Sequence, residues 1–180
     1  MMSFDTNLLE TLYASRDQNL TPIFIAITQM GSTLMVGGLS LALGLYLLTR
    51  QKLSYFAGLC ISILGTAGLV YGLKELVGRA RPGMFYQAYL ETGFSFPSGH
   101  AAFSLALYGF IAYLLWKHSS RYRFLLAAIF IIFIVLVGFS RLYLGVHFAS
   151  DVIGGYAIGA LCLALGILAS EKLNRYSIWS

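Results

Sequence analysis

Five apolar runs, each close to the thickness of a lipid bilayer, constrain this chain more than any other feature. An α-helix needs about 20 apolar residues to cross ~30 Å of hydrocarbon. Only 11% of the residues are charged, whereas soluble domains carry about 25%. The sequence therefore predicts an all-α, polytopic membrane helix bundle with about five transmembrane helices. The predicted spans cover approximately residues 22–49 (with a possible bend near Gly31), 53–74, 98–116, 124–140 and 148–170.

The chain of 180 residues is too short for a second domain once its spans are counted, so we treat residues 1–180 as one membrane-embedded domain. The formal net charge is +5, but basic residues at span ends act as topology signals, and we expect no nucleic-acid partner. Cys60 and Cys162 lie inside apolar runs, where we interpret them as packing residues. No feature indicates an obligate protein partner.

The segment before the first span is more polar. Its apolar residues recur at helical spacing, which predicts a short amphipathic helix lying along the membrane surface. These residues are Phe4, Leu8, Leu9, Leu12 and Tyr13.

An odd number of spans places the two ends of the chain on opposite sides of the membrane. The positive-inside rule assigns the more basic side to the cytoplasm. That side holds Arg50, Lys52, Lys117, Arg121, Arg123, Lys172 and Arg175, whereas the other holds Arg16, Lys74, Arg79, Arg81 and Arg141. We therefore expect a cytoplasmic C-terminus, with the loops at 75–97 and 141–147 facing outward.

Small residues repeat at four-residue spacing in two spans, as Gly68 with Gly72 and as Gly155 with Gly159. This spacing lets helices approach closely. It serves contacts within a bundle as readily as contacts between protomers, so the oligomeric state stays open.

Three polar segments lie at span ends on the predicted outer side, where ionisable groups are costly and usually functional. In the first, Lys74 and Arg81 are seven residues apart, about two helical turns, and can point into one site. An ammonium and a guanidinium suit the oxygens of a phosphate. The alternative is that both are ordinary cations snorkelling from a helix end.

The second segment, Pro97-Ser98-Gly99-His100, opens the third span. Proline suits the first helical turn, and free amides at a helix N-terminus bind anions. The Ser98 hydroxyl adds a donor, Gly99 permits close approach, and His100 can act as a general acid. A plain helix cap with an interfacial histidine is the alternative.

The third segment contains Arg141, His147 and Asp151 and enters the fifth span. On a helix, His147 and Asp151 would share a face. A carboxylate that orients one imidazole nitrogen leaves the other free to attack, which is the arrangement of an activated nucleophile. Arg141 supplies a further cation for phosphate. A structural His–Asp pair is the alternative.

The joint occurrence of these segments favours a phosphate-transfer site. Glu75 and Glu91 look isolated, and no carboxylate cluster typical of Mg²⁺ or Zn²⁺ is visible, so we expect no metal and no other cofactor. His118 lies among basic residues on the opposite side, and we assign it no role.

Together the three segments resemble the signature of the type 2 phosphatidic acid phosphatase superfamily, over residues 74–160. The resemblance implies a helical membrane phosphatase in which His147 attacks phosphorus, Asp151 orients it, and His100 protonates the leaving group. It also implies that the phosphoryl oxygens are bound by Lys74, Arg81, Ser98, Gly99 and Arg141.

The substrate is then a lipid phosphate, with undecaprenyl diphosphate, phosphatidylglycerophosphate, phosphatidic acid and a lipid A phosphate all compatible. The compact chain suggests a bacterial inner-membrane protein with its active site facing the periplasm or exterior. Transfer of the phosphoryl group to an acceptor other than water, as in a lipid phosphotransferase, is the closest alternative. A non-catalytic anion-binding membrane protein would leave His100 and the His147–Asp151 pair without a purpose, and haloperoxidase activity does not suit a short chain of five spans.

Overall fold

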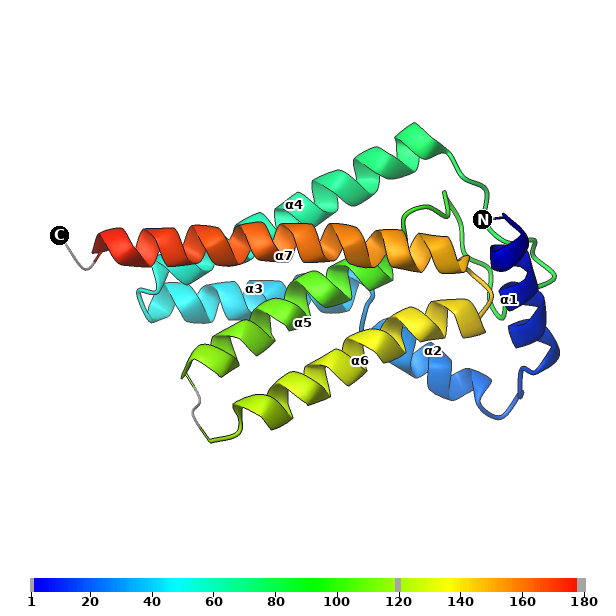
Figure 1. The fold of residues 1–180 in the computed structure, drawn as a ribbon, viewed down its shortest axis with the longest axis horizontal. Coiled ribbons are helices and arrows are strands. Elements are labelled where there is room, and N and C mark those ends of the chain that lie inside the picture. The colour runs from blue at the N-terminus through cyan, green and yellow to red at the C-terminus, as the bar shows by residue number, and fades with distance from the viewer. Residues whose placement is uncertain (1, 119–120, 178–180) are drawn as a thin grey trace.

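The computed structural model describes residues 2–118 and 121–177. These residues form a bundle of long helices with one short helix across its end (Figure 1). The helices are α1 (Met2–Ala14), α2 (Thr21–Gln29), α3 (Thr33–Thr49), α4 (Leu53–Val77), α5 (Gly99–His118), α6 (Arg123–Tyr143) and α7 (Ala149–Ser177). Five spans are long and apolar enough to cross a membrane, with α2 and α3 together forming the first. This confirms the predicted all-α membrane bundle. Residues 119 and 120 of the predicted basic loop lie outside the described residues.

The first span is interrupted at residues 30–32, which confirms the bend expected near Gly31. Ser32 caps the new helix because its hydroxyl accepts a hydrogen bond from the Met35 amide at 3.3 Å. The Tyr108 hydroxyl donates to the Met30 carbonyl at 2.7 Å and satisfies a backbone group freed by the break. A side chain at Gly31 would come within 2.6 Å of Val137 and 3.2 Å of the His100 carbonyl. The interruption therefore lies against the start of α5.

Helix α7 packs closely against the start of α5 through glycines. A Cβ at Gly155 would lie 2.4 Å from the Ser98 carbonyl oxygen, and one at Gly159 would lie 2.5 Å from that of Ala102. The predicted close approach is confirmed for this pair. Gly68 and Gly72 make no such approach to the described residues of this chain, since an added Cβ at either would meet nothing within 4 Å. Spacing alone does not reveal which face of a helix meets a neighbour.

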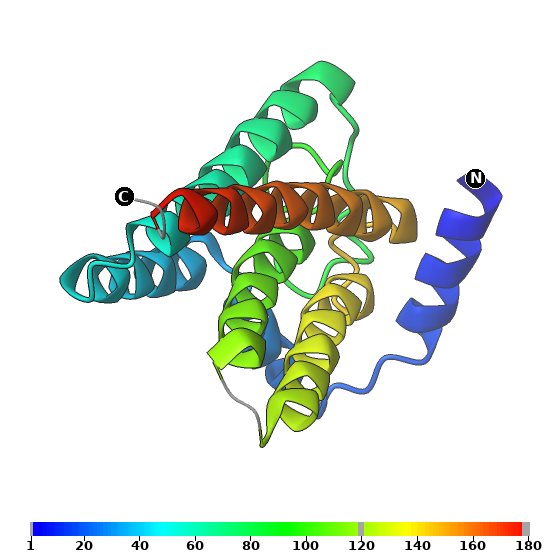
Figure 2. The ribbon, with the colours of Figure 1, turned by 60° about the vertical axis from the view of Figure 1, so that its left-hand side comes forward.

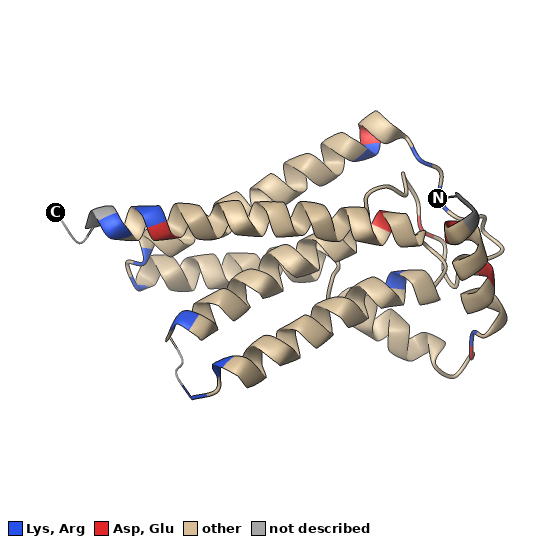
Figure 3. Ribbon diagram, in the orientation of Figure 1, with Lys and Arg blue, Asp and Glu red and all other residues tan. Residues whose placement is uncertain are grey.

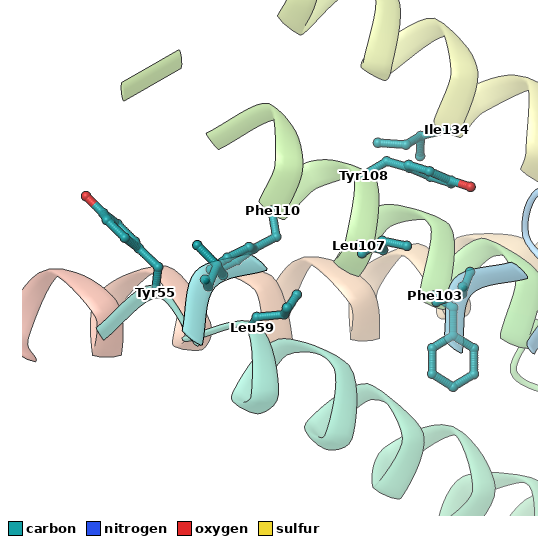
Figure 4. Packing of buried hydrophobic residues seen from close by; sticks show 9 residues of the cluster. Tyr55, Leu59, Phe103, Leu107, Tyr108, Phe110 and Ile134 are labelled. Atoms are coloured by element: carbon teal, nitrogen blue, oxygen red, sulfur yellow. The ribbon is translucent and has the colours of Figure 1, made fainter. Parts of the chain in front are cut away.

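The main buried apolar cluster joins α3, α4, α5 and α6 (Figure 4). Phe110 and Leu107 of α5 are fully buried at its centre, with Leu59 on α4 and Ile134 on α6 beside them. The outward faces of the same helices remain apolar, with Leu34 88% and Ile131 61% exposed. Apolar residues inside and outside are expected when the surroundings are lipid, because the bundle surface then faces hydrocarbon.

Charged residues collect at the two ends of the bundle, as Figure 3 shows. One end carries the α3–α4 turn, the start of α6 and the end of α7; we call it the basic end. The other, the site end, carries the loop of residues 78–98 and the starts of α5 and α7 (Figures 1 and 2). Helix α1 lies across the site end and contacts α6 and α7. Leu9 is buried and Glu10 is exposed, as an amphipathic helix requires, whereas Phe4 of the predicted apolar set is 62% exposed. A position along the membrane surface stays a prediction.

Candidate active site

His147 and Asp151 meet at the start of α7. The Nδ1 of His147 lies 3.5 Å from the Asp151 Oδ2, which also accepts hydrogen bonds from Ser95 Oγ at 2.5 Å and from the Phe148 amide at 2.8 Å. His147 precedes the helix, which begins at Ala149. The prediction that both residues lie on one helix face is therefore wrong, although the expected contact forms. His147 reaches the carboxylate from the loop because the Asp151 side chain turns back toward the residues before the helix and accepts a hydrogen bond from the Phe148 amide.

A cavity of about 110 Å³ lies beside the imidazole. The first polar segment contributes Lys74 and Arg81 to its wall, the second contributes Gly99 and His100, and the third contributes His147. Three parts of the chain predicted from their sequence patterns therefore surround one space. The interrupted first span completes the wall with Gly31 and Thr33.

Arg81 reaches the cavity from a loop. Helix α4 ends at Val77, and Gly78 follows in the left-handed region at φ +59°. The argument from two helical turns between Lys74 and Arg81 is therefore wrong for Arg81. Its Nη1 donates to the Val146 carbonyl at 2.9 Å and lies 3.1 Å from His147 Nε2. Lys74 Nζ donates to the Phe94 carbonyl, which holds the ammonium at the same loop.

Ser98 differs from expectation in one respect. Its amide donates to the Asp151 carbonyl at 2.9 Å, so it is not free to bind an anion. This bond ties the start of α5 to the start of α7. The Ser98 hydroxyl oxygen is buried and has no hydrogen-bond partner among the described residues.

Arg141 is fully buried in the last turn of α6, not in an outward loop as predicted. Its Nη1 donates to Thr28 Oγ1 at 2.7 Å and to the Tyr89 hydroxyl at 2.5 Å, and its Nη2 donates to Glu91. The Nε atom has no partner among the described residues. Arg141 is not among the residues that line the cavity, but it binds Glu91, which is.

Glu91 is not isolated, contrary to the sequence interpretation. Its carboxylate lines the cavity, binds Arg141 and lies 3.6 Å from Arg81 Nη2. Burial acts to raise the pKa of Glu91, but the Arg141 guanidinium outweighs it and lowers the pKa to about 2. No local pattern indicates this contact, because it joins a loop to two distant segments. Across the described residues, no group of three or more His, Cys, Asp or Glu side chains is placed to hold a metal ion.

His147 is only 2% exposed. Burial lowers its pKa to about 4, although the hydrogen bond to Asp151 acts in the opposite direction. The imidazole is therefore neutral at physiological pH, with one nitrogen turned to Asp151 and the other to Arg81. Because a guanidinium can only donate, the Nε2 that faces Arg81 is unprotonated and carries the lone pair that a nucleophile requires.

Two further residues were missed from the sequence. Arg79 Nη1 donates to Asp151 Oδ1 at 2.7 Å, and its Nη2 donates to Asp5 Oδ2 at 2.9 Å. Asp5 is 3% exposed. A signal did exist, since Asp5 shares the apolar face of its helix with Leu8, Leu9 and Leu12. A carboxylate on an apolar face indicates a buried partner.

The fold and the site together define a helical membrane protein with a buried His–Asp pair beside a cationic cavity. The sequence profile of the PAP2 superfamily matches residues 54–175. Phosphatidylglycerophosphatase B of Bacillus subtilis is 33% identical over 98% of this chain and 88% of its own length. Lipid A 1-phosphatase of Rhizobium etli is 34% identical over 65% of this chain and 46% of its own length. The chain belongs to the PAP2 superfamily.

Two solved structures have the same fold as this chain. The crystal structure of a transmembrane PAP2 type phosphatidylglycerolphosphate phosphatase from Bacillus subtilis aligns with a TM-score of 0.86 at 33% identity, covering 95% of this chain and 86% of that one. Aquifex aeolicus LpxE aligns with a TM-score of 0.71 at 24% identity, covering 93% and 94%, and supports the fold alone. The predicted enzyme class, a membrane lipid phosphatase, is confirmed.

Proposed function

We propose that this protein hydrolyses the phosphomonoester of a membrane lipid through a covalent phosphohistidine on His147. The observation that carries the proposal is the cavity in which His147, His100 and the cations Lys74 and Arg81 share one wall. A nucleophile, an acid and phosphate-binding groups are the components that phosphoryl transfer needs.

In the first half-reaction, His147 Nε2 attacks phosphorus, and the bond from phosphorus to the lipid oxygen breaks. His100 donates a proton to that oxygen, so the lipid leaves as a neutral alcohol. Asp151 accepts the Nδ1 hydrogen bond and stabilises the positive charge that develops on the ring. In the second half-reaction, His100 takes a proton from water as the water oxygen attacks phosphorus, the N–P bond breaks, and inorganic phosphate leaves.

The cations stabilise charge on the phosphoryl oxygens. Lys74, Arg81 and Gly99 line the cavity. Two buried polar atoms, Arg141 Nε and Ser98 Oγ, lack partners among the described residues. Buried polar atoms are rarely left unsatisfied, so each would gain from an added oxygen acceptor. These atoms support roles in phosphate binding for Ser98 and Arg141. In this scheme the protein's own cations bind the phosphate and no metal takes part.

The similarity to phosphatidylglycerophosphatase B extends along 98% of the chain, which favours phosphatidylglycerophosphate as the substrate. We further propose a bacterial inner-membrane location with the site end facing the periplasm and the C-terminus in the cytoplasm. The cluster of Arg50, Lys52, Lys172 and Arg175 at the basic end supports this orientation. Cysteine introduced at exposed Met84 should react with an impermeant maleimide in intact cells, whereas cysteine at Gln51 should not.

The deciding experiment measures phosphate release by the purified protein in excess EDTA. The panel comprises phosphatidylglycerophosphate, phosphatidic acid, undecaprenyl diphosphate and a lipid A phosphate. We expect release to survive EDTA, to be fastest with phosphatidylglycerophosphate, and to disappear in His147→Ala. Acid-labile ³²P on the wild-type protein after rapid quenching would identify the phosphohistidine. Formation of that adduct without phosphate release, but with transfer to an added alcohol, would indicate a phosphotransferase instead.

A further inference from the structure

A chain of hydrogen bonds runs from the His147–Asp151 pair to the N-terminal helix. The two carboxylate oxygens of Asp151 have different partners. Oδ2 faces His147 and accepts from Ser95 and the Phe148 amide, whereas Oδ1 accepts from Arg79 at 2.7 Å. Arg79 is therefore the one charged side chain among the described residues that forms an ion pair with Oδ1.

The guanidinium of Arg79 is itself held on several sides. Its Nη2 donates to Asp5 at 2.9 Å, its Nη1 donates to Ser150 Oγ at 2.6 Å, and its Cζ lies 4.4 Å from the centroid of the Phe148 ring. Because a guanidinium is planar and rigid, fixing one edge also fixes the edge that binds Asp151. Arg79 thus transmits the position of α1 to the carboxylate.

Asp5 is fixed equally firmly. Its Oδ1 accepts from the Ser150 amide at 3.0 Å, and its Oδ2 accepts from the Ser150 hydroxyl at 2.5 Å. Burial acts to raise the pKa of Asp5, but the hydrogen bonds from Ser150 and Arg79 together lower it. The carboxylate is therefore charged, and it anchors α1 to the first turn of α7 next to Asp151.

The backbone of Arg79 also takes part in this network. The Arg79 carbonyl accepts from the Ser95 amide at 2.8 Å, and Ser95 Oγ donates to Asp151 Oδ2. Arg79 therefore acts on both oxygens of Asp151, directly on one and through Ser95 on the other. Neither Arg79 nor Asp5 lines the cavity beside His147, and their side chains are held by each other, by Asp151 and by Ser150.

We propose that Arg79 and Asp5 are positioning residues for the reaction, which hold the Asp151 carboxylate in the orientation that His147 requires, and that α1 thereby forms part of the active centre. This inference rests on the proposed function. A carboxylate bound at one oxygen only can rotate, and the Nδ1 hydrogen bond then loses its alignment. The expected consequence is a slower chemical step with unchanged substrate binding.

The test compares steady-state kinetics of Asp5→Asn, Arg79→Gln, their double variant and Arg79→Lys on the best lipid substrate. We expect kcat to fall about ten- to a hundred-fold, the scale on which supporting partners of catalytic ligands act, with KM within about two-fold of wild type. Arg79→Lys should have a higher kcat than Arg79→Gln, because lysine keeps the positive charge although it lacks the two-pronged guanidinium. Glu10→Gln, which removes the same charge from an exposed position of α1, is the matched control and should leave kcat unchanged.

The double variant tests whether the two residues act along one chain. If Asp5 acts through Arg79, adding Asp5→Asn to Arg79→Gln should lower kcat little further, whereas independent effects would multiply. Melting temperature is measured for every variant. If Arg79→Gln does not fold, Asp5→Asn carries the test alone, because asparagine can keep the bond from the Ser150 amide.

Wild-type kcat in folded Asp5→Asn and Arg79→Gln would overturn this proposal, as would a loss confined to KM. Its failure is distinguishable from failure of the proposed function. Turnover that persists in His147→Ala would reject the histidine nucleophile. Inactive His147→Ala beside fully active Asp5→Asn and Arg79→Gln would reject only the positioning role.

Discussion

The two ends of the bundle use the same residue types in opposite ways. At the site end, Arg141 and Asp151 are fully buried, and Asp5 is 3% exposed. At the basic end, Arg50, Lys52 and Arg121 are exposed, and the Lys117–Glu171 pair has side chains 35% and 37% exposed. Figure 3 shows both sets of charges with apolar helix between them.

The difference shows what burial adds to a charge. Each buried ion at the site end needs several partners, because an uncompensated charge away from water is strongly unfavourable. Those partners come from α1, α2, α6, α7 and the loop of residues 78–98, so the charges also fix these segments relative to one another. Charges at the basic end are more exposed, so they can be solvated and need fewer protein partners.

The largest expected contrast is between the histidines. His147→Ala removes the proposed nucleophile and should reduce turnover by about four orders of magnitude or more, the loss typical of a missing nucleophile. His118→Ala, at the basic end, should keep wild-type turnover. Both are measured as phosphate release from the same lipid. Comparable activity of the two variants would remove the functional distinction between the ends.

The arginines give a second contrast. Arg141→Met removes one of the two guanidinium groups beside Glu91. Breaking a fully buried pair costs about 3–5 kcal/mol, and Glu91 keeps Arg81 at 3.6 Å and is 21% exposed, so the cost should lie below that range. We expect a correspondingly lower free energy of unfolding in mixed micelles, together with loss of activity. Arg121→Met should alter neither quantity. Equal stability of the two variants would show that the buried charges do not hold the segments of the site end together.

The pH profile sharpens the description of the site end. Because burial lowers the pKa of His147 to about 4, its lone pair is available above that pH and is lost as pH falls through it. Between pH 7 and 5.5, the fraction of neutral His147 should change by less than about 5%, whereas a histidine of pKa 6.5 would lose most of its neutral form. The test is kcat/KM against pH, corrected for the ionisation of the substrate measured by ³¹P NMR. An acidic limb near pH 6.5 that persists after this correction would contradict a buried nucleophile.

The smallest effect is expected at the basic end. Glu171→Gln removes the Lys117 partner, whose Nζ lies 2.5 Å from the carboxylate. Half-exposed pairs contribute about 1 kcal/mol or less, so the melting temperature should change by only a few degrees and kcat should stay at its wild-type value. A large loss of activity would show that the two ends are coupled through the bundle.

Much of the fold followed from the sequence, because crossing a bilayer imposes a length and a composition on every span. The five spans and the break near Gly31 were predicted, with boundaries that differed by a few residues at the helix ends. The gathering of His100, His147 and Asp151 at one end was also predictable, since the number of intervening spans decides on which side each segment emerges. Gly155 and Gly159 could not be distinguished from Gly68 and Gly72, because spacing does not specify a partner helix.

Only the tertiary structure decided which residues support the catalytic pair. Arg79 and Asp5 are 74 positions apart, and Glu91 meets Arg141 from 50 positions away; no local pattern encodes such contacts. The sequence by itself determined the membrane architecture, the chemical groups and the end of the bundle that holds them. Their partners, their burial and the neutral state of His147 depend on loop paths and helix packing. The physical reason is that hydropathy and helical period act locally along the chain, whereas electrostatics in a buried site depends on distances between segments that only folding brings together.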